Sequence, residues 1–238
     1  MQTIEVISLI YKSISFCDFI VSQLRQYAVS FEGFDVTWRI VANDATSQVI
    51  NHLKSNNIPH SVFTNPNPNE YYLNRVYRAW NYGGSSSSGD YICFVNSDMA
   101  FSPNWLENLT KHISDDKILT SRLVESGKMP SGKYGISHYF GNTPGSFKES
   151  EWLEYSKKIS ENSIHPGGLY MPFLIKKKLF VDSGMYPEGN VYHLGAIIKS
   201  GDTYFFEDVL KQKFNIDHYT VFDSLVYHFQ EGEMTHPE

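Results

Sequence analysis

The feature that most constrains the fold is an alternation of apolar, strand-like runs with segments of helical periodicity in the first half of the chain. Residues 4–11 (IEVISLIY) are apolar and rich in β-branched side chains, and residues 16–27 after them have helical spacing. The strand signal returns in residues 36–42 (VTWRIVA) and is strongest in residues 90–96 (DYICFVN). This alternation predicts a single α/β domain with a mostly parallel sheet flanked by helices.

Polar residues follow the apolar runs at the points where the strands are expected to end. These positions are Tyr11, Asn43, Asp44, Asn96, Ser97 and Asp98. In a parallel α/β sheet the ligand site lies outside the carboxyl ends of the strands, so convergence of these ends on one rim predicts a binding site. Asn and Asp also punctuate ordinary turns, and that alternative stays open for each end taken by itself.

Composition and charge narrow the classes of function. The chain has 238 residues and a formal net charge of −6, which opposes the phosphate neutralisation on which nucleic-acid affinity depends. We therefore expect no nucleic-acid partner. Cys17 and Cys93 have no CxxC partner, so neither a disulfide framework nor a structural zinc site is expected. No segment approaches the ~20 apolar residues of a spanning helix, which predicts a soluble, cytoplasmic protein and leaves peripheral membrane association open.

The domain is expected to comprise residues 1–238. Residues 83–89 (GGSSSSG) have the composition of a linker, but a strand follows at once, so we expect a loop there and no domain boundary. Between residues 117 and 163 periodicity is weak and glycine and proline are frequent, which predicts a long loop region. Residues 202–213 (DTYFFEDVLKQK) are expected to form an amphipathic helix.

Three segments in a fixed order carry a likeness to a known family. Residues 79–83 (AWNYG) come first, residues 89–98 (GDYICFVNSD) follow, and residues 206–210 (FEDVL) come last. They resemble the Ala-Arg-Asn-x-Gly segment, the central block and the Glu-Asp pair of the inverting glycosyltransferases of family 2, which have the GT-A fold. The family has Asp-x-Asp where this chain has Asn96-Ser97-Asp98, and Trp80 stands at the family's arginine position.

The resemblance implies a GT-A-like domain that transfers a sugar from a nucleoside-diphosphate sugar to a carbohydrate acceptor with inversion, as in polysaccharide biosynthesis. It implies a nucleotide-sugar-binding half in residues 1–113 and an acceptor-binding half in residues 114–238. Because a hydroxyl must lose a proton as it attacks, the Glu-Asp pair provides the base. We expect Asp208 to be this base and Glu207 to orient a neighbour, since adjacent residues on a helix point about 100° apart.

The donor side follows from the same resemblance. Asp44 is expected to accept a hydrogen bond from the base, with Tyr11 along the same edge, which predicts a UDP- or dTDP-sugar. Arg75 and Arg78 lie three residues apart on an expected helix and are either diphosphate ligands or ordinary surface arginines. The donor-binding set is completed by Asn96 and Ser97.

The leaving group of this reaction calls for positive charge. A departing diphosphate accumulates negative charge, which a net-negative protein stabilises through a cation or local donors. Asp98 at a strand end is the expected ligand of Mn²⁺ or Mg²⁺, with His228 as a further nitrogen ligand. A core histidine beside two aromatic residues is an equal alternative for His228.

Two other functions stay open. A non-catalytic nucleotide-sugar- or carbohydrate-binding module of the same fold would account for the amide at Asn96. A sugar nucleotidyltransferase would need a glycine-rich, basic phosphate loop after the first strand, and residues 9–13 (LIYKS) do not provide one.

Overall fold

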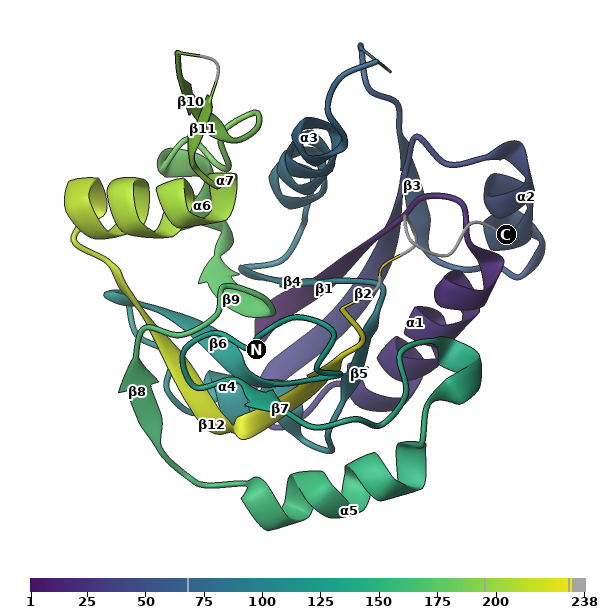
Figure 1. Cartoon of the computed structure of the whole chain (residues 1–238), viewed down its shortest axis with the longest axis vertical. Helices are drawn as coiled ribbons and strands as arrows, with labels where there is room; N and C mark the ends of the chain where they lie inside the picture. Colours follow the sequence, from purple (N-terminus) through teal and green to yellow (C-terminus); the bar gives the residue numbers. More distant parts are fainter. Residues whose placement is uncertain (68, 195, 231, 233–238) are drawn as a thin grey trace.

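A central mixed β-sheet organises the chain, and helices cover both of its faces (Figure 1). The structure is a computed structural model that describes residues 1–67, 69–194, 196–230 and 232. The strands of the sheet follow the order β3 (His60–Phe63), β2 (Phe34–Asn43), β1 (Gln2–Ile10), β4 (Tyr91–Val95), β9 (Phe173–Lys176), β6 (Lys117–Glu125), β12 (Asp217–His228) and β5 (Met99–Phe101). At its periphery β7 (Ile136–Ser137) pairs with β6, and β8 (Ile164–Pro166) pairs with β12.

Strand direction divides the sheet into two parts. The strands β3, β2, β1 and β4 are parallel to their neighbours. Beyond β4 the sheet is mixed: β9 is antiparallel to β4 and β6, β5 is antiparallel to β12, and β6 and β12 are parallel. The predicted α/β fold is confirmed, and its parallel part is the one whose strands carry the polar ends described above.

The alternation of side chains along each strand produces two cores. In β1, Ile4, Val6 and Ile10 belong to one core, whereas Ile7 belongs to the other. The first core lies under α1 (Ile14–Tyr27), α2 (Ser47–Ser55), α4 (Trp105–Thr110) and α5 (Glu149–Ile159). The second lies under α3 (Tyr72–Ser85), α6 (Lys177–Asp182) and η2 (Tyr204–Lys213). Each fully buried Val, Ile or Phe contributes about 1.5–3 kcal/mol, so both layers of helices are firmly attached to the sheet.

The segment before β12 departs from the expected α-helix. A hairpin of β10 (Val191–His193) and β11 (Ala196–Lys199) leads into the short helix α7 (Gly201–Thr203). The chain then continues without interruption into η2, which is wound as a π-helix. A π-helix has i→i+5 hydrogen bonds, so its side chains follow a different angular period from those of an α-helix.

The long loop expected at residues 117–163 is wrong at β6 and at α5. β6 lies inside the sheet between β9 and β12, and α5 covers the first core. The polar residues Thr120 and Ser121 interrupt the apolar pattern of β6, which hid the strand. Both are buried and satisfied by hydroxyl groups of β12: Ser121 bonds Ser224 at 2.8 Å, and Thr120 bonds Thr220 at 3.3 Å. Residues 126–148 connect the two elements and contain β7 and η1 (Pro144–Ser146).

The glycine- and serine-rich segment 83–89 is partly helical. α3 extends through its first residues, because Gly84 packs against the ring of Phe180 where a Cβ would have no room. None of the described helices combines the length and the apolar character needed to cross a lipid bilayer.

Candidate active site

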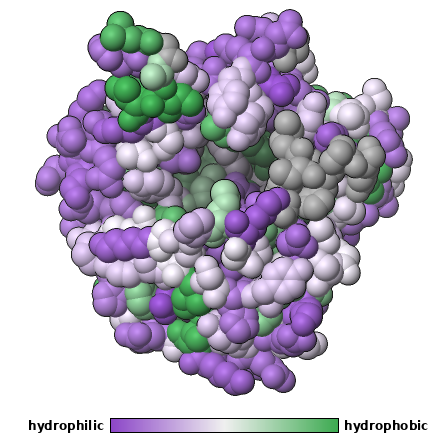
Figure 2. All heavy atoms as spheres, viewed as in Figure 1, coloured by the Kyte–Doolittle hydropathy of each residue, from purple (hydrophilic) through white to green (hydrophobic). Residues whose placement is uncertain are grey.

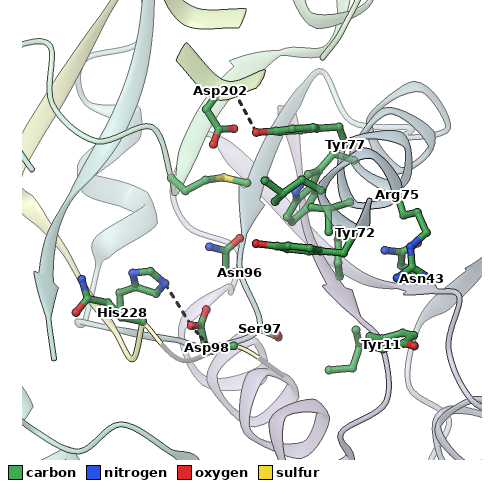
Figure 3. A pocket seen from close by; sticks show the side chains of 18 of the residues that line it. Tyr11, Asn43, Tyr72, Arg75, Tyr77, Asn96, Ser97, Asp98, Asp202 and His228 are labelled. Carbon is green, nitrogen blue, oxygen red and sulfur yellow. Dashed lines mark hydrogen bonds and ion pairs between the residues drawn. The ribbon is translucent and has the colours of Figure 1, made fainter. Parts of the chain in front are cut away.

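A cavity of about 560 Å³ opens at the carboxyl ends of β1, β2 and β4, within the roughly 300–1,000 Å³ of typical small-molecule sites. Its walls come from α3, from the 128–129 segment, from the end of β12 and from α7 (Figure 3). The predicted residues that line it are Tyr11, Asp44, Arg75, Asn96, Ser97, Asp98 and His228. The polar strand ends thus converge on one rim, and the roles given to these residues stay predictions.

At one end of the cavity, Asp44 is held in a fixed orientation. Its backbone is left-handed, with φ of 49°. The backbone N–H of Asn65 donates to Asp44 Oδ1 at 2.7 Å, and the Asn65 side chain donates to Oδ2 at 2.9 Å. Arg75 reaches Oδ2 at 3.4 Å, and its guanidinium lies 5.9 Å from the centre of the Tyr11 ring. A carboxylate beside an aromatic ring can accept from a flat, hydrogen-bonding ligand.

A buried ion cluster lies at another part of the cavity. His228 Nε2 is 3.2 Å from Asp98 Oδ2, and His228 Nδ1 is 3.2 Å from Glu125 Oε1. Burial opposes charge on all three groups, but the ion pairs prevail. The pKa of His228 is raised by the two carboxylates, and the pKa values of Asp98 and Glu125 are lowered by His228.

The donor set at this cluster fits a divalent cation. Asp98 supplies carboxylate oxygens and His228 an imidazole, ligand types that suit Mn²⁺. Because the two carboxylates favour the protonated form of His228, a cation bound through its Nε2 would have to displace the proton that faces Asp98. Glu125 holds the other ring nitrogen, as carboxylates commonly do for metal-binding histidines. Among the described residues, no group of three or more His, Cys, Asp or Glu forms a complete metal site. Phosphate oxygens and water would therefore have to complete the coordination shell.

A connecting segment that the sequence did not single out closes this part of the cavity. Lys128 and Met129 line it, together with Gln230. Gln230 Oε1 accepts from the backbone N–H groups of Gly127 and Met129, each at 3.2 Å. Because Lys128 lies in the region expected to be a structureless loop, only its positive charge could have indicated a role.

The two arginines of α3 have different surroundings. Arg75 lines the cavity, whereas Arg78 is not among the lining residues. Arg78 forms an ion pair with Glu70 and a second with Glu188, at 3.2 Å. Of the two alternatives left open for these arginines, the position of Arg75 favours a ligand of the diphosphate, and the ion pairs of Arg78 favour an ordinary surface arginine. Side chains three residues apart on an α-helix point in directions about 60° apart. This angle is enough to place Arg75 at the cavity and Arg78 outside it.

The structure places the predicted Glu-Asp pair outside this cavity. Neither Glu207 nor Asp208 is among the lining residues, and Asp208 Oδ2 is 2.5 Å from Lys199 Nζ in an ion pair. The helix instead presents Asp202 to the cavity from its first turn (Figure 3). Sequence reasoning noted Asp202 only as the start of a helix, and a lone acid at a helix start has no distinguishing signal because acids are common there.

Apolar side chains gather on the β10–β11 hairpin, which precedes this helix (Figure 2). The exposed residues are Tyr192, Leu194, Ile197 and Ile198. The face shown in Figure 2 is also hollowed near its centre, below the hairpin.

Solved structures with a similar fold are glycosyltransferases. GalNAc-T7 with UDP, GalNAc and Mn²⁺ has a TM-score of 0.56 at 12% identity, over 95% of this chain and 44% of that one. TarS of S. aureus has a TM-score of 0.57 at 13% identity, over 95% and 60%. The mannosyltransferase PcManGT from Pyrobaculum calidifontis, with GDP-Man and Mn²⁺, has a TM-score of 0.58 at 11% identity, over 94% and 56%. The chain spans about half of these proteins, and at such identities the likeness shows the GT-A fold alone.

The sequence comparison identifies the family. The family described as glycosyl transferase family 2 matches residues 42–180, which is more than half of the chain. The chain therefore belongs to glycosyltransferase family 2, and the resemblance found in the sequence is confirmed. No curated protein sequence matches it.

Proposed function

We propose that this chain transfers a sugar from a UDP- or dTDP-sugar to a carbohydrate acceptor, with inversion and with a divalent cation. The observation that supports this most is the single cavity lined by residues from three strand ends, α3 and the end of β12. A carboxylate beside an aromatic ring lies in one part of it and a carboxylate-histidine pair in another. A nucleoside diphosphate needs both environments, the first for its base and the second for a cation at its diphosphate.

The base of the nucleotide is proposed to bind at Asp44. The ring N–H of uracil or thymine is a donor, and Asp44 offers acceptor oxygens whose orientation is fixed by Asn65. Arg75 lies 3.4 Å from this carboxylate and also lines the cavity, so it would contribute positive charge toward the diphosphate.

Asp98 and His228 are proposed to hold Mn²⁺ or Mg²⁺. When bound, the ion would neutralise negative charge that develops on the departing diphosphate. Asp98 is fixed for this task, since the backbone N–H of Gly232 donates to its Oδ2 at 3.2 Å. Lys128 adds a cationic group to the same wall. The structures of GalNAc-T7 and PcManGT contain Mn²⁺, which supports a metal in this chain.

We propose inversion because the transfer can proceed by direct displacement, without a covalent intermediate between the sugar and the protein. An acceptor hydroxyl attacks the anomeric carbon directly, the bond to the diphosphate breaks, and a base removes the hydroxyl proton. Asn96 lines the cavity and can hydrogen-bond a sugar hydroxyl through its amide.

Nucleotide binding tests this proposal. UDP, dTDP and GDP are titrated into the chain by calorimetry with and without Mn²⁺. We expect UDP or dTDP to bind more tightly than GDP, and Mn²⁺ to raise the affinity. Asp98→Asn should lower the Mn²⁺-dependent affinity by about 10–100-fold. Asp223→Asn is the matched control, because Asp223 is similarly buried at 8% exposure but does not line the cavity.

Two results would contradict it. If Asp98→Asn and Asp223→Asn have the same Mn²⁺-dependent UDP affinity, the chain does not bind its donor at this cavity. UDP binding that ignores Mn²⁺, without UDP release from any UDP-sugar, would favour the non-catalytic binding module.

A further inference from the structure

The cavity has three lining carboxylates among the described residues: Asp44, Asp98 and Asp202. The proposed function uses Asp44 for the base of the nucleotide and Asp98 for the cation. Asp202 is left without a task. In Figure 3 its side chain points into the cavity from the side opposite Asp98, with Asn96 between them in this view.

The fold holds Asp202 in place through its neighbour Gly201. A Cβ on Gly201 would lie 2.5 and 2.6 Å from atoms of the Tyr77 ring and 2.8 Å from the Gly189 carbonyl oxygen. The helix therefore begins in direct contact with α3. The backbone N–H of Asp202 donates to the Tyr77 hydroxyl at 3.2 Å, and the Gly201 N–H donates to Asn190 Oδ1 at 3.1 Å.

The surroundings of Asp202 suit a group that takes up a proton. Burial raises its pKa to about 6, which a hydrogen bond with Tyr77 only partly offsets. The titratable groups that face it are the hydroxyls of Tyr77, Tyr170 and Tyr186, whose own pKa values are raised by burial. These tyrosines are uncharged near neutral pH, and no ion pair among the described residues places a cation on Asp202. A base is most effective when its pKa lies near the working pH.

Asp208 has the opposite surroundings. Its carboxylate is neutralised by Lys199 at 2.5 Å. It also lies six residues after Asp202 on one continuous helical segment, and Asp202 lines the cavity whereas Asp208 does not. The helical segment that presents Asp202 to the cavity therefore leaves Asp208 outside it.

We infer that Asp202, and not Asp208, is the general base of the transfer reaction. The inference rests on the proposed function. In this step the carboxylate of Asp202 accepts the proton of the acceptor hydroxyl as its oxygen forms a bond to the anomeric carbon. The bond from that carbon to the diphosphate oxygen breaks, and the nucleoside diphosphate leaves with the electron pair. Asp202 then returns its proton to water.

The test compares Asp202→Asn with Asp208→Asn in the full chain. UDP affinity in the presence of Mn²⁺ is measured by calorimetry. UDP release is measured with UDP-glucose, UDP-galactose, UDP-N-acetylglucosamine and dTDP-glucose (as dTDP release), with water as the acceptor. We expect both variants to keep wild-type UDP affinity, and Asp202→Asn to lose release by about 10²–10⁴-fold. Release by the wild type and by Asp208→Asn should rise with pH through about 6, and this rise should be absent in Asp202→Asn.

Melting curves show whether the variants fold, and Asp202→Ala, which adds no atoms, replaces the amide variant if that variant does not. Loss of release confined to Asp208→Asn, or loss of UDP affinity in Asp202→Asn, would overturn the assignment. Mn²⁺-dependent UDP binding by the wild type without release from any of these donors would overturn it as well, because an activated carboxylate would also deprotonate water; binding that ignores Mn²⁺, without release, would contradict the proposed function. A wild-type chain that does not bind UDP at all would contradict the proposed function instead.

Discussion

The two sides of the cavity differ in how well their residues follow from the sequence. On the proposed donor side, Asp44, Asn96 and Asp98 lie where a residue directly after a strand must lie. On the proposed acceptor side, the Glu-Asp pair of the family motif lies outside the cavity, and Asp202 lines it instead. The direction of a strand end is fixed by its sheet neighbours, whereas a side chain on a helix points according to where the helix begins and how it is wound. A motif is therefore a safer guide on a strand than on a helix.

The largest effect that would sharpen this comparison is expected from Gly201→Ala. The added methyl group has no room beside Tyr77, so the start of the helix must shift and carry Asp202 with it. A displacement of about 1 Å can cost about 100-fold in rate, and we expect a loss of UDP release of this order. Calorimetry should show unchanged UDP affinity, since the donor side is untouched.

Gly145→Ala is the control for this change, because a Cβ at Gly145 meets open space. Equal release by the two variants would show that the start of the helix does not position a reacting group.

More of the fold than of the proposed acceptor side could be predicted from the sequence. The runs ending at Ile10, Asn43 and Val95 are mostly apolar, and their alternation with helices defines a parallel sheet. β6 escaped notice because Thr120 and Ser121 are buried polar residues whose partners lie a hundred residues away. Such pairing, like the π winding of η2, depends on tertiary contacts that no local pattern records.

The next largest effect is expected from Asp44→Asn on the donor side. This change removes a charged acceptor while keeping the shape of the side chain. Hydrogen bonds to charged groups contribute about 1.5–3 kcal/mol, so UDP affinity should fall by about 10–100-fold. The measurement is UDP calorimetry with Mn²⁺, with Asp35→Asn as a control because Asp35 does not line the cavity. A change in UDP release without a change in affinity would move Asp44 to the other side of the comparison.

Arg75→Ala and Arg78→Ala form a matched pair on α3. Arg75 lines the cavity, and Arg78 is engaged by Glu70 and Glu188. We expect UDP affinity to fall by about tenfold in Arg75→Ala, and to stay at the wild-type value in Arg78→Ala. The reverse order in calorimetry would show that the diphosphate lies on the outer face of α3.

The smallest effect is a change in stability that depends on pH. The pKa of Asp202 is raised to about 6 in the folded chain, from 3.8 when unfolded. Between these values the folded state binds more protons, so Asp202 costs stability as the pH rises through this window, and the full cost applies above about 6. At pH 7.5 the free energy of unfolding of Asp202→Asn should therefore exceed that of the wild type by on the order of 1 kcal/mol, after allowance for solvent at the cavity. The variant should accordingly unfold at a higher temperature.

The difference in melting temperature should shrink as the pH is lowered toward 5. A difference that grows on acidification would mean that Asp202 is stabilised as a carboxylate by a partner other than the three tyrosines.

A crystal structure of the chain with UDP and Mn²⁺ tests the central claim most directly. The account predicts that the uracil ring lies against Asp44 and Tyr11, that Mn²⁺ contacts Asp98 and His228, and that the terminal phosphate points toward the side of the cavity that carries Asp202. A nucleotide bound away from the ends of β1, β2 and β4, or a diphosphate that lies nearer Asp208 than Asp202, would contradict it.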